Sequence, residues 1–317
     1  MNSNEPREID IAIIGGGPAG MAAGLYAARA LRSTVLFEGG VLGGQIATSD
    51  RVENYPGFPD GIGGFELAMA FHQQSEHHGM ETVYAMVSSL EPQEDGRFRL
   101  GTDGGGEFIA KAVIVTAGAN PNKLGIPGET ELTGRGVSYC ATCDAAFFKN
   151  MDVAVVGGGD AAVEEAIFTT RYASKVTLIH RRDELRAQAV LQERARNAEN
   201  LEFLWDTVVE EIHGSDQVTG EVEKVVLRNV KTGEQSEMPV KAVFIFIGQT
   251  PNSNLLEGLV ELDAGKHACV NDWMETKVPG LFVAGDVRAN AARQVVSSAG
   301  DGATAAIRAD HYITDHF

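Results

Sequence analysis

Two cysteines separated by two residues, Cys140 and Cys143, have the types and spacing expected of a redox pair. A Cys-x-x-Cys motif forms a reactive dithiol, supplies half of a metal site, or is incidental spacing. Zinc needs about four ligands, and the third cysteine, Cys269, with scattered histidines supplies no second paired motif. We therefore predict a redox dithiol and no metal.

Asp144 follows the second cysteine directly. Cleaving a disulfide requires a proton for the leaving thiolate, and a carboxyl held near a sulfur in a partly apolar site can deliver it. The alternative is that Asp144 caps a helix beginning at Ala145. Both interpretations stay open at the level of sequence.

Two glycine-rich segments, 15–20 and 157–162, follow the pattern Gly-x-Gly-x-x-Gly/Ala. Each lies between a short apolar run and a stretch with helical spacing of small residues. The predicted strands and helices are 11–14 with 18–32 and 153–156 with 161–173. Strand, tight turn and helix in this order form the dinucleotide-binding fingerprint, in which glycines let the backbone approach a pyrophosphate. The sequence therefore predicts two nucleotide sites.

An internal repeat supports a duplicated architecture. Segments 111–122 and 241–252 are identical at six of twelve positions, and each is an apolar strand ended by glycine and proline. They are either two ordinary strand ends or the places where the chain passes between two halves, with Gly118 and Gly248 as candidate hinges.

We predict an α/β fold of two three-layer, Rossmann-like dinucleotide-binding domains, the second inserted into the first. The first comprises residues 1–118 and 248–317, and the second, with the dithiol, comprises residues 119–247.

The ends of the second strands distinguish the two nucleotides. Glu38 lies 18 residues after Gly20, where such folds place an acid on ribose hydroxyls, and it would repel a 2′-phosphate. The corresponding segment of the second half is basic and predicts selectivity for NADPH; it contains His180, Arg181, Arg182 and Arg186. The alternative for this cluster is a solvated charged face.

The first site has features that favour a flavin. Segment 279–286 is predicted to be a strand that ends in an acid, Asp286. The carboxylate of Asp286 suits a ribityl hydroxyl, although Asp286 could also be a turn residue. A helix predicted from Ala292 onward would direct its N-terminal amides at a reduced flavin.

Charge excludes some partners. The formal net charge is −18 and the pI is about 4.8, so nucleic acid and anionic lipid surfaces are poor partners. The apolar run 11–14 is too short for a signal peptide or a membrane span. We expect a protein of the cytoplasm.

Taken together, the motifs resemble those of the low-molecular-weight, NADPH-dependent thioredoxin reductases, over nearly the whole chain. The matching segments are 15–20, 43–45, 53–57, 140–144, 157–165, 180–187, 285–286 and 293–294. Three positions depart from the usual pattern: Ala145 replaces glycine, Leu185 replaces phenylalanine, and Thr116-Ala117-Gly118 replaces Ala-Thr-Gly.

The resemblance implies a homodimeric FAD enzyme with thioredoxin as its partner. It implies that Cys140 and Cys143 form the redox disulfide, with Cys143 facing the flavin and Cys140 attacking the partner. The residues expected at FAD are Gly15, Gly17, Pro18, Ala19, Gly20, Glu38, Gly44, Gln45, Asn54, Val87, Gly118, Gly285, Asp286, Arg293, Gln294 and Val295. Those expected at NADPH are Gly157, Gly159, Asp160, Ala161, Glu164, His180, Arg181, Arg182 and Arg186.

The predicted activity is thioredoxin-disulfide reduction, with electrons passing from NADPH through FAD to the dithiol. Because dithiol and nicotinamide must reach one flavin in turn, we expect a domain rotation about Gly118 and Gly248. The alternatives are a flavin disulfide reductase serving a peroxiredoxin system, one that takes electrons from ferredoxin, and a dithiol oxidase that reduces oxygen. A nucleotide-sensing module without turnover is an alternative of a different class.

Overall fold

The computed structural model describes residues 6–49, 51–215 and 220–317. The chain divides into two compact units: unit 1 is Met1–Asn120 with Thr250–Phe317, and unit 2 is Pro121–Gln249. Unit 2 is continuous in sequence and interrupts unit 1. Unit 1 ends and resumes two residues beyond positions 118 and 248. The predicted fold class, α/β with two dinucleotide-binding domains, is confirmed.

Unit 1 is built on one mixed sheet with the strand order β3-β2-β1-β6-β5-β4, and β17 also pairs with β6. Its strands are β1 (Arg7–Ile14), β2 (Thr34–Phe37), β3 (Glu81–Val83), β4 (Val87–Pro92), β5 (Phe98–Thr102), β6 (Glu107–Val115) and β17 (Leu281–Val283). Its helices are α1 (Pro18–Arg29), α2 (Gly64–His77) and α6 (Val295–His316), with 3₁₀ turns η1 (Gly44–Thr48) and η3 (Asn254–Leu256).

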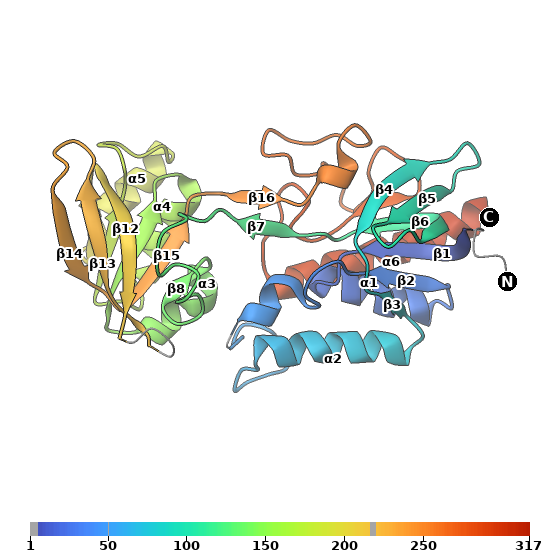
Figure 1. Ribbon diagram of the computed structural model, residues 1–317, viewed down its shortest axis with the longest axis horizontal. Coiled ribbons are helices and arrows are strands. Elements are labelled where there is room, and N and C mark those ends of the chain that lie inside the picture. The colour runs from blue at the N-terminus through green and yellow to red at the C-terminus, as the bar shows by residue number, and fades with distance from the viewer. Residues whose placement is uncertain (1–5, 50, 216–219) are drawn as a thin grey trace. The chain divides into compact units, whose positions relative to one another are not determined.

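The alternation of side chains along β1 separates two apolar layers. Ile11 and Ile13 pack against α1, α2 and α6, whereas Ala12 and Ile14 pack on the other face with β4 and β5. Strands β2, β1, β6 and β17 are parallel, so their carboxyl ends lie at one edge of the sheet. Figure 1 shows the helices along this sheet.

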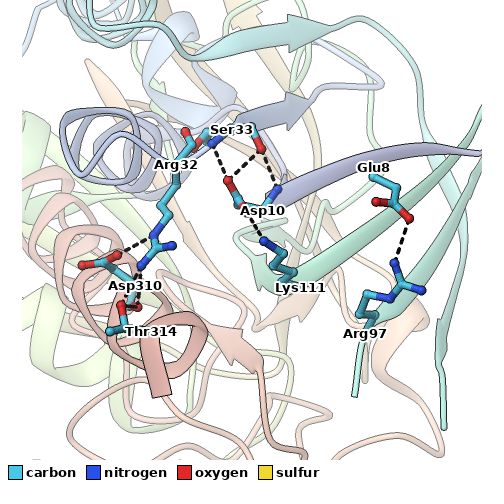
Figure 2. Close-up of polar contacts among 9 residues, drawn as sticks. Glu8, Asp10, Arg32, Ser33, Arg97, Lys111, Asp310 and Thr314 are labelled. Carbon is cyan, nitrogen blue, oxygen red and sulfur yellow. Dashed lines mark hydrogen bonds and ion pairs between the residues drawn. The ribbon is translucent and has the colours of Figure 1, made fainter. Parts of the chain in front are cut away.

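Polar pairs join the middle of β1 and β6 to the loop that leads into β2 (Figure 2). Asp10 accepts hydrogen bonds from the Ser33 backbone N–H at 2.9 Å and from Lys111 Nζ at 2.7 Å. Arg32 reaches helix α6, where its Nε donates to Asp310 Oδ1 at 2.6 Å. These bonds join the loop after α1 to the sheet and to the C-terminal helix, which secures α1 behind the glycine turn.

Unit 2 has the same plan, with an added antiparallel sheet. A parallel sheet has the order β11-β10-β9-β15-β8, and a second sheet has the order β12-β13-β14. The strands are β8 (Val137–Ser138), β9 (Asp152–Gly157), β10 (Lys175–Ile179), β11 (Leu201–Leu204), β12 (Thr207–Gly214), β13 (Val222–Asn229), β14 (Gln235–Pro239) and β15 (Ala242–Phe246). The helices are α3 (Ala141–Asp144), α4 (Asp160–Thr169) and α5 (Ala189–Arg196), with 3₁₀ turn η2 (Ala145–Phe148).

Unit 2 has three layers, which are its helices, its parallel sheet and the antiparallel sheet β12-β13-β14 (Figure 1). The side chains of strand β9, in the parallel sheet, alternate between the two outer layers. Val153 and Val155 pack against the helices, while Ala154 and Val156 pack against β12 and β13. The chain enters and leaves unit 2 through β7 (Ala119–Pro121) and β16 (Gln249–Pro251), which pair with each other. These short strands lie within the repeated segments 111–122 and 241–252.

Helix boundaries differ from the predicted ones where the backbone turns left-handed. Helix α6 begins at Val295 rather than near Ala292, because Arg293 has φ of +57° and cannot continue a helix. Helix α1 ends at Arg29, two residues before Leu31 with φ of +63°.

Within the described residues, no helix has the length and apolar character required to cross a membrane.

Candidate functional site

The dithiol lies at the end of strand β8 in unit 2. Cys140 and Cys143 form a disulfide with an Sγ–Sγ distance of 2.10 Å. Cys140 is the N-cap of α3, and its Sγ accepts a hydrogen bond from the Cys143 backbone N–H at 3.2 Å. Both sulfurs are therefore held at the start of one helical turn, where backbone amides stabilise a thiolate.

Asp144 faces Ser138 across this turn. Ser138 Oγ donates to Asp144 Oδ2 at 2.6 Å and accepts from the Cys140 backbone N–H at 3.1 Å. Burial raises the pKa of Asp144, and the Ser138 hydrogen bond offsets part of this shift. The carboxyl therefore holds its proton to higher pH than an exposed aspartate, as a proton donor requires.

The Asp144 carboxyl does not act as a helix cap. The first helical turn begins earlier, at Ala141, with Cys140 as its cap. Asp144 directly precedes the 3₁₀ turn η2, but its side chain makes no capping hydrogen bond there. Ala145, which departs from the family pattern, is fully buried and contributes its methyl group to the core of unit 2.

The first glycine turn, between β1 and α1, is closely packed on one side. A Cβ on Gly15 would lie 2.6 Å from the Thr116 carbonyl oxygen, and one on Gly20 would lie 1.9 Å from the Gly15 carbonyl oxygen. In contrast, a Cβ on Gly17 would meet no atom within 4 Å. Helix α1 has Gly17 as its N-cap, Pro18 at its start and no side-chain cap. Its first amides are thus available to a phosphate.

Glu38 is fixed above this turn. Its Oε2 accepts from the Gly16 backbone N–H at 2.7 Å, and its Oε1 accepts from the Gly40 backbone N–H at 2.6 Å. A carboxylate held beside the glycine turn at the end of β2 is placed as the ribose-binding acid of a dinucleotide fold is.

Other residues predicted at the first site lie close to one another within unit 1. A Cβ on Gly44 would lie 3.5 Å from the Gly17 Cα, and a Cβ on Gly285 would lie 3.0 Å from the Ala19 Cβ. Asn54 Nδ2 donates to Gln294 Oε1 at 3.0 Å. The start of η1 and the turn after β17 therefore both border the glycine turn.

Asp286, three residues after the end of β17, is half-buried. Ser298 Oγ donates to Asp286 Oδ1 at 3.4 Å, and burial raises the pKa of Asp286. Gln294 caps helix α6 through a capping box with Ser297, and Val295 is the first helical residue. Arg293 precedes the cap and is exposed.

Three remaining residues of this set lie at the borders of the site. Gln45 Nε2 donates to Asn120 Oδ1 at 3.0 Å, and the Gly118 carbonyl accepts from the Asn252 backbone N–H at 2.9 Å. Val87 is buried at the start of β4, and the preceding residue, Met86, lies against Gly39. Each is thus connected to a segment that borders the glycine turn or the connection to unit 2.

The second glycine turn, between β9 and α4, repeats the geometry of the first. A Cβ on Gly157 would lie 2.4 Å from the Phe246 carbonyl oxygen and 2.5 Å from the Ala162 Cβ. Gly159 is the N-cap of α4, again without a side-chain cap and with open space around it. Ala161 is exposed in the first turn, and Asp160 accepts from the Gln188 backbone N–H at 2.7 Å.

The basic segment after β10 contains two kinds of residue. Arg181, Arg182 and Arg186 are exposed, and the Arg186 backbone N–H donates to the Gly158 carbonyl at 2.8 Å. His180 is buried against Gly158, and burial lowers its pKa, with the Arg186 charge adding to this effect. The positive charge of the segment therefore comes from its arginines.

Glu164 has a different setting from the other residues predicted at NADPH. It lines a surface pocket of about 300 Å³ together with Thr142, Glu165 and Arg171.

In the described part of the chain, no cluster of His, Cys, Asp and Glu has the composition of a metal site.

Sequence reasoning missed several residues that shape the two sites. Thr116 Oγ1 donates to the Gly15 carbonyl at 2.8 Å. Ser138 and Ser298 contact the predicted acids Asp144 and Asp286. Single serines and threonines carry no motif. Only their position near a predicted acid or glycine turn could have indicated them.

Comparison with known proteins places the chain among flavin-linked reductases. It matches the pyridine nucleotide-disulphide oxidoreductase family over residues 9–304. It is 47% identical over 313 residues to a thioredoxin reductase of Bacillus subtilis, covering 98% of this chain and 97% of the relative. It is 48% identical over 314 residues to a thioredoxin reductase of Peptoclostridium litorale, covering 97% of this chain and 98% of the relative.

Solved structures agree with this result. The thioredoxin reductase of Streptococcus pyogenes is 44% identical with a TM-score of 0.92, over 98% of this chain and 100% of that one. That of Lactococcus lactis, in a form described as the FR conformation, is also 44% identical, over 97% and 99%, with a TM-score of 0.65. By its sequence, its fold and its paired glycine turns, the chain belongs to the pyridine nucleotide-disulphide oxidoreductase family.

Proposed function

We propose that this protein is an NADPH-dependent thioredoxin reductase with FAD as its cofactor. The observation that carries the proposal is a closed Cys140–Cys143 disulfide, in the same unit as a glycine turn flanked by exposed arginines. Relatives named thioredoxin reductases, which match this chain over 97% and 98% of their own length, support it. No feature of the described residues favours ferredoxin, oxygen or a peroxiredoxin system over this assignment.

The residues of unit 1 fit FAD. The glycine turn leaves open space at Gly17, uncapped amides at the start of α1 and a fixed carboxylate at Glu38. Helix amides suit the pyrophosphate, and Glu38 suits the hydroxyls of the adenosine ribose. We assign Asp286 to the ribityl chain and the start of α6, from Gln294, to the flavin ring.

The residues of unit 2 fit NADPH. Gly157 and Gly159 form the pyrophosphate turn, and the guanidinium groups of the exposed residues Arg181, Arg182 and Arg186 supply positive charge for a 2′-phosphate. His180 Nε2 is buried and has no hydrogen-bond partner among the described residues. This nitrogen lies beneath the second glycine turn, and we assign His180 to packing against that turn.

The chemistry that FAD supplies when bound is two-electron transfer between NADPH and a disulfide. The chain's own residues then carry out the exchange. Two-electron reduction breaks the Cys140–Cys143 bond and gives two cysteine sulfurs at the thiol or thiolate level. The Asp144 carboxyl, whose pKa is raised by burial, donates a proton to the leaving sulfur.

In the second half of the reaction, the Cys140 thiolate attacks the thioredoxin disulfide and displaces one of its sulfurs. Cys143 then attacks the mixed disulfide, re-forms the Cys140–Cys143 bond and releases thioredoxin with two thiols. NADPH supplies two electrons and one proton as hydride, and solvent supplies the second proton through Asp144. Both electrons and both protons leave with the reduced thioredoxin, so the cycle balances.

A rotation of unit 2 completes the proposal. The chain crosses between the units in two places, through strands β7 and β16 that pair with each other. Gly118 and Gly248, next to these strands, have φ of +69° and +108°. We assign them as hinges that present first the nicotinamide and then the dithiol to one flavin.

We also propose a homodimer that acts in the cytoplasm.

An NADPH-driven assay with thioredoxin from the same cell tests the function. The expected result is NADPH consumption that requires both thioredoxin and the enzyme, with NADH far less effective. Cys143→Ser should abolish it. If NADPH is consumed equally fast without thioredoxin and oxygen is consumed instead, the protein is an oxidase. If NADPH does not bleach the flavin in anaerobic solution, NADPH is not the electron donor.

A further inference from the structure

A buried carboxylate, Glu129, lies at the centre of a hydrogen-bond network in unit 2. The residue is 1% exposed. Oε1 accepts from the Leu124 backbone N–H at 2.9 Å and from Tyr139 Oη at 2.8 Å, and Oε2 accepts from the Gly125 backbone N–H at 2.7 Å. Three donors thus satisfy one buried carboxylate.

Such a network is stable only when all of its members are present, because a buried carboxylate that loses a donor has no water to replace it. Tyr139 is a donor that stays protonated. Burial, and next the hydrogen bond to Glu129, raise the pKa of Tyr139 above its ordinary value, so the phenol keeps its proton.

Tyr139 lies immediately before the first cysteine of the dithiol. On its other side is Ser138, whose hydroxyl accepts from the Cys140 backbone N–H at 3.1 Å and donates to Asp144 at 2.6 Å. Cys140 itself has extended backbone, with φ of −147° and ψ of 98°. The chain that enters Cys140 is therefore anchored through two successive side chains.

The other donors to Glu129 come from the segment that follows the connection between the units. Leu124 and Gly125 lie three and four residues after the end of β7 at Pro121, and the Asn122 backbone N–H donates to the Gly248 carbonyl at 3.0 Å. One carboxylate therefore joins the chain that enters unit 2 to the chain that enters the dithiol.

We propose that Glu129 and Tyr139 are positioning residues for Cys140, which hold the attacking sulfur in place relative to the entry of unit 2. Neither side chain has a hydrogen bond to the sulfurs, so both act through the backbone of Tyr139 and Cys140. The proposal rests on the proposed function, because that function makes Cys140 the sulfur that meets thioredoxin.

Tyr139→Phe tests the proposal with the least disturbance, since it removes one hydroxyl. The matched control is Tyr172→Phe in the same unit, whose ring packs against Phe168. In the FAD-loaded enzyme, kcat/KM for thioredoxin should fall about tenfold. NADPH-driven reduction of ferricyanide, which does not need the dithiol, should keep its wild-type rate. A role in stability alone would lower both rates together.

A second measurement is independent of thioredoxin. After reduction with a phosphine, Cys140 is alkylated with iodoacetamide over a range of pH. Trypsin cuts after Arg135 and Lys149 and releases a single peptide with both cysteines, so fragmentation of this peptide assigns the alkylated sulfur. In Tyr139→Phe, the alkylation of Cys140 should be slower at neutral pH and shift to higher pH, because the thiolate is less well aligned with the helix amides.

Glu129→Gln, with the exposed Glu131→Gln as its control, should have the larger effect because the amide places an N–H against a backbone donor. Wild-type alkylation and thioredoxin kinetics in folded Tyr139→Phe would overturn the proposal, even if Glu129→Gln does not fold. If the wild-type protein reduces no thioredoxin, the proposed function fails, while the alkylation profiles still decide whether Tyr139 positions Cys140.

Discussion

Among single residues, Asp144 has the environment of a proton donor. It is half-buried beside the dithiol, it accepts one hydroxyl hydrogen bond from Ser138, and its pKa is raised by burial. A carboxyl with these properties is expected of a general acid and not of an ordinary surface aspartate. The sulfur that leaves when the Cys140–Cys143 disulfide is cleaved takes this proton.

Asp144→Asn keeps the size of the side chain and removes its proton. We expect thioredoxin reduction to fall by about a hundredfold, in the range of losses seen for general acids. Ferricyanide reduction by NADPH should be unchanged. A pH profile of wild-type turnover should decline as pH rises through the raised pKa of Asp144, and the variant should lack this decline. An identical profile in both proteins would show that another group supplies the proton.

The same pKa shift affects stability with a definite sign. Because the folded protein binds this proton more tightly than the unfolded chain, the contribution of Asp144 is full below the ordinary aspartate pKa and is lost as pH rises through the raised value. In apo-protein melts across this window, Asp144→Asn should reduce the fall in unfolding temperature with pH. An unaltered slope would contradict the shift.

Arginine charge determines the choice between NADPH and NADH in our assignment. Replacing Arg181 and Arg182 by alanine should raise the KM for NADPH at least about tenfold, a loss of ~1.4 kcal/mol per factor of ten. The KM for NADH should hardly change, since it lacks the 2′-phosphate. Arg196→Ala, an exposed arginine on α5, is the control. Equal losses for both nucleotides would place the arginines outside the phosphate site.

At the level of elements, helices α1 and α6 of unit 1 approach each other closely at a glycine. A Cβ on Gly302 of α6 would lie 1.9 Å from the Ala19 carbonyl oxygen of α1, whereas Gly300, two residues earlier on the same helix, has open space around it. The contact therefore sets the distance between the helix behind the glycine turn and the helix that follows the Gln294 cap.

Two alanine substitutions on α6 should have opposite effects. Gly302→Ala should destabilise the protein by roughly 1–3 kcal/mol and weaken FAD binding, because α6 must move away from α1. Gly300→Ala should stabilise by about 0.5–1 kcal/mol, as alanine does at open helical positions. Thermal unfolding and FAD titration measure both effects. Equal stability of the two variants would show that the helices separate without cost.

The elements that carry motifs were predictable from sequence, and those built on long-range pairing were not. Both glycine turns lie between a strand and a helix at the predicted residues. The short helix α3 was missed because four residues around a dithiol have no periodicity, and its cap is a cysteine sulfur. Glu129 was missed because its partner Tyr139 is ten residues away, without any pattern that links them.

For the molecule as a whole, the duplicated plan has a functional meaning. Each unit has a parallel set of strands with a glycine turn at the carboxyl end of one of them, and the chain passes between the units in two places. Segments 111–122 and 241–252, which repeat one another in sequence, contain both crossings. Relative motion of the units is the default for such a connection.

A crosslink between one engineered cysteine in each unit tests the rotation. The locked protein should retain at most one half-reaction, either flavin reduction by NADPH or electron transfer to the dithiol. The same double variant without the crosslinker should turn over normally. Full turnover of the locked protein with thioredoxin would rule out the rotation.

The insertion of unit 2 also sets the order in which the protein can be completed during synthesis. Residues 121–249 form a continuous unit, but unit 1 lacks β17 beside β6 and α6 against α1 until the last segment of the chain has been made. Since chains emerge from the N-terminus, the unit bearing the dithiol can be folded while the flavin pocket is still open. We therefore expect unit 1, with the residues that we assign to FAD, to be completed after the unit that bears the dithiol.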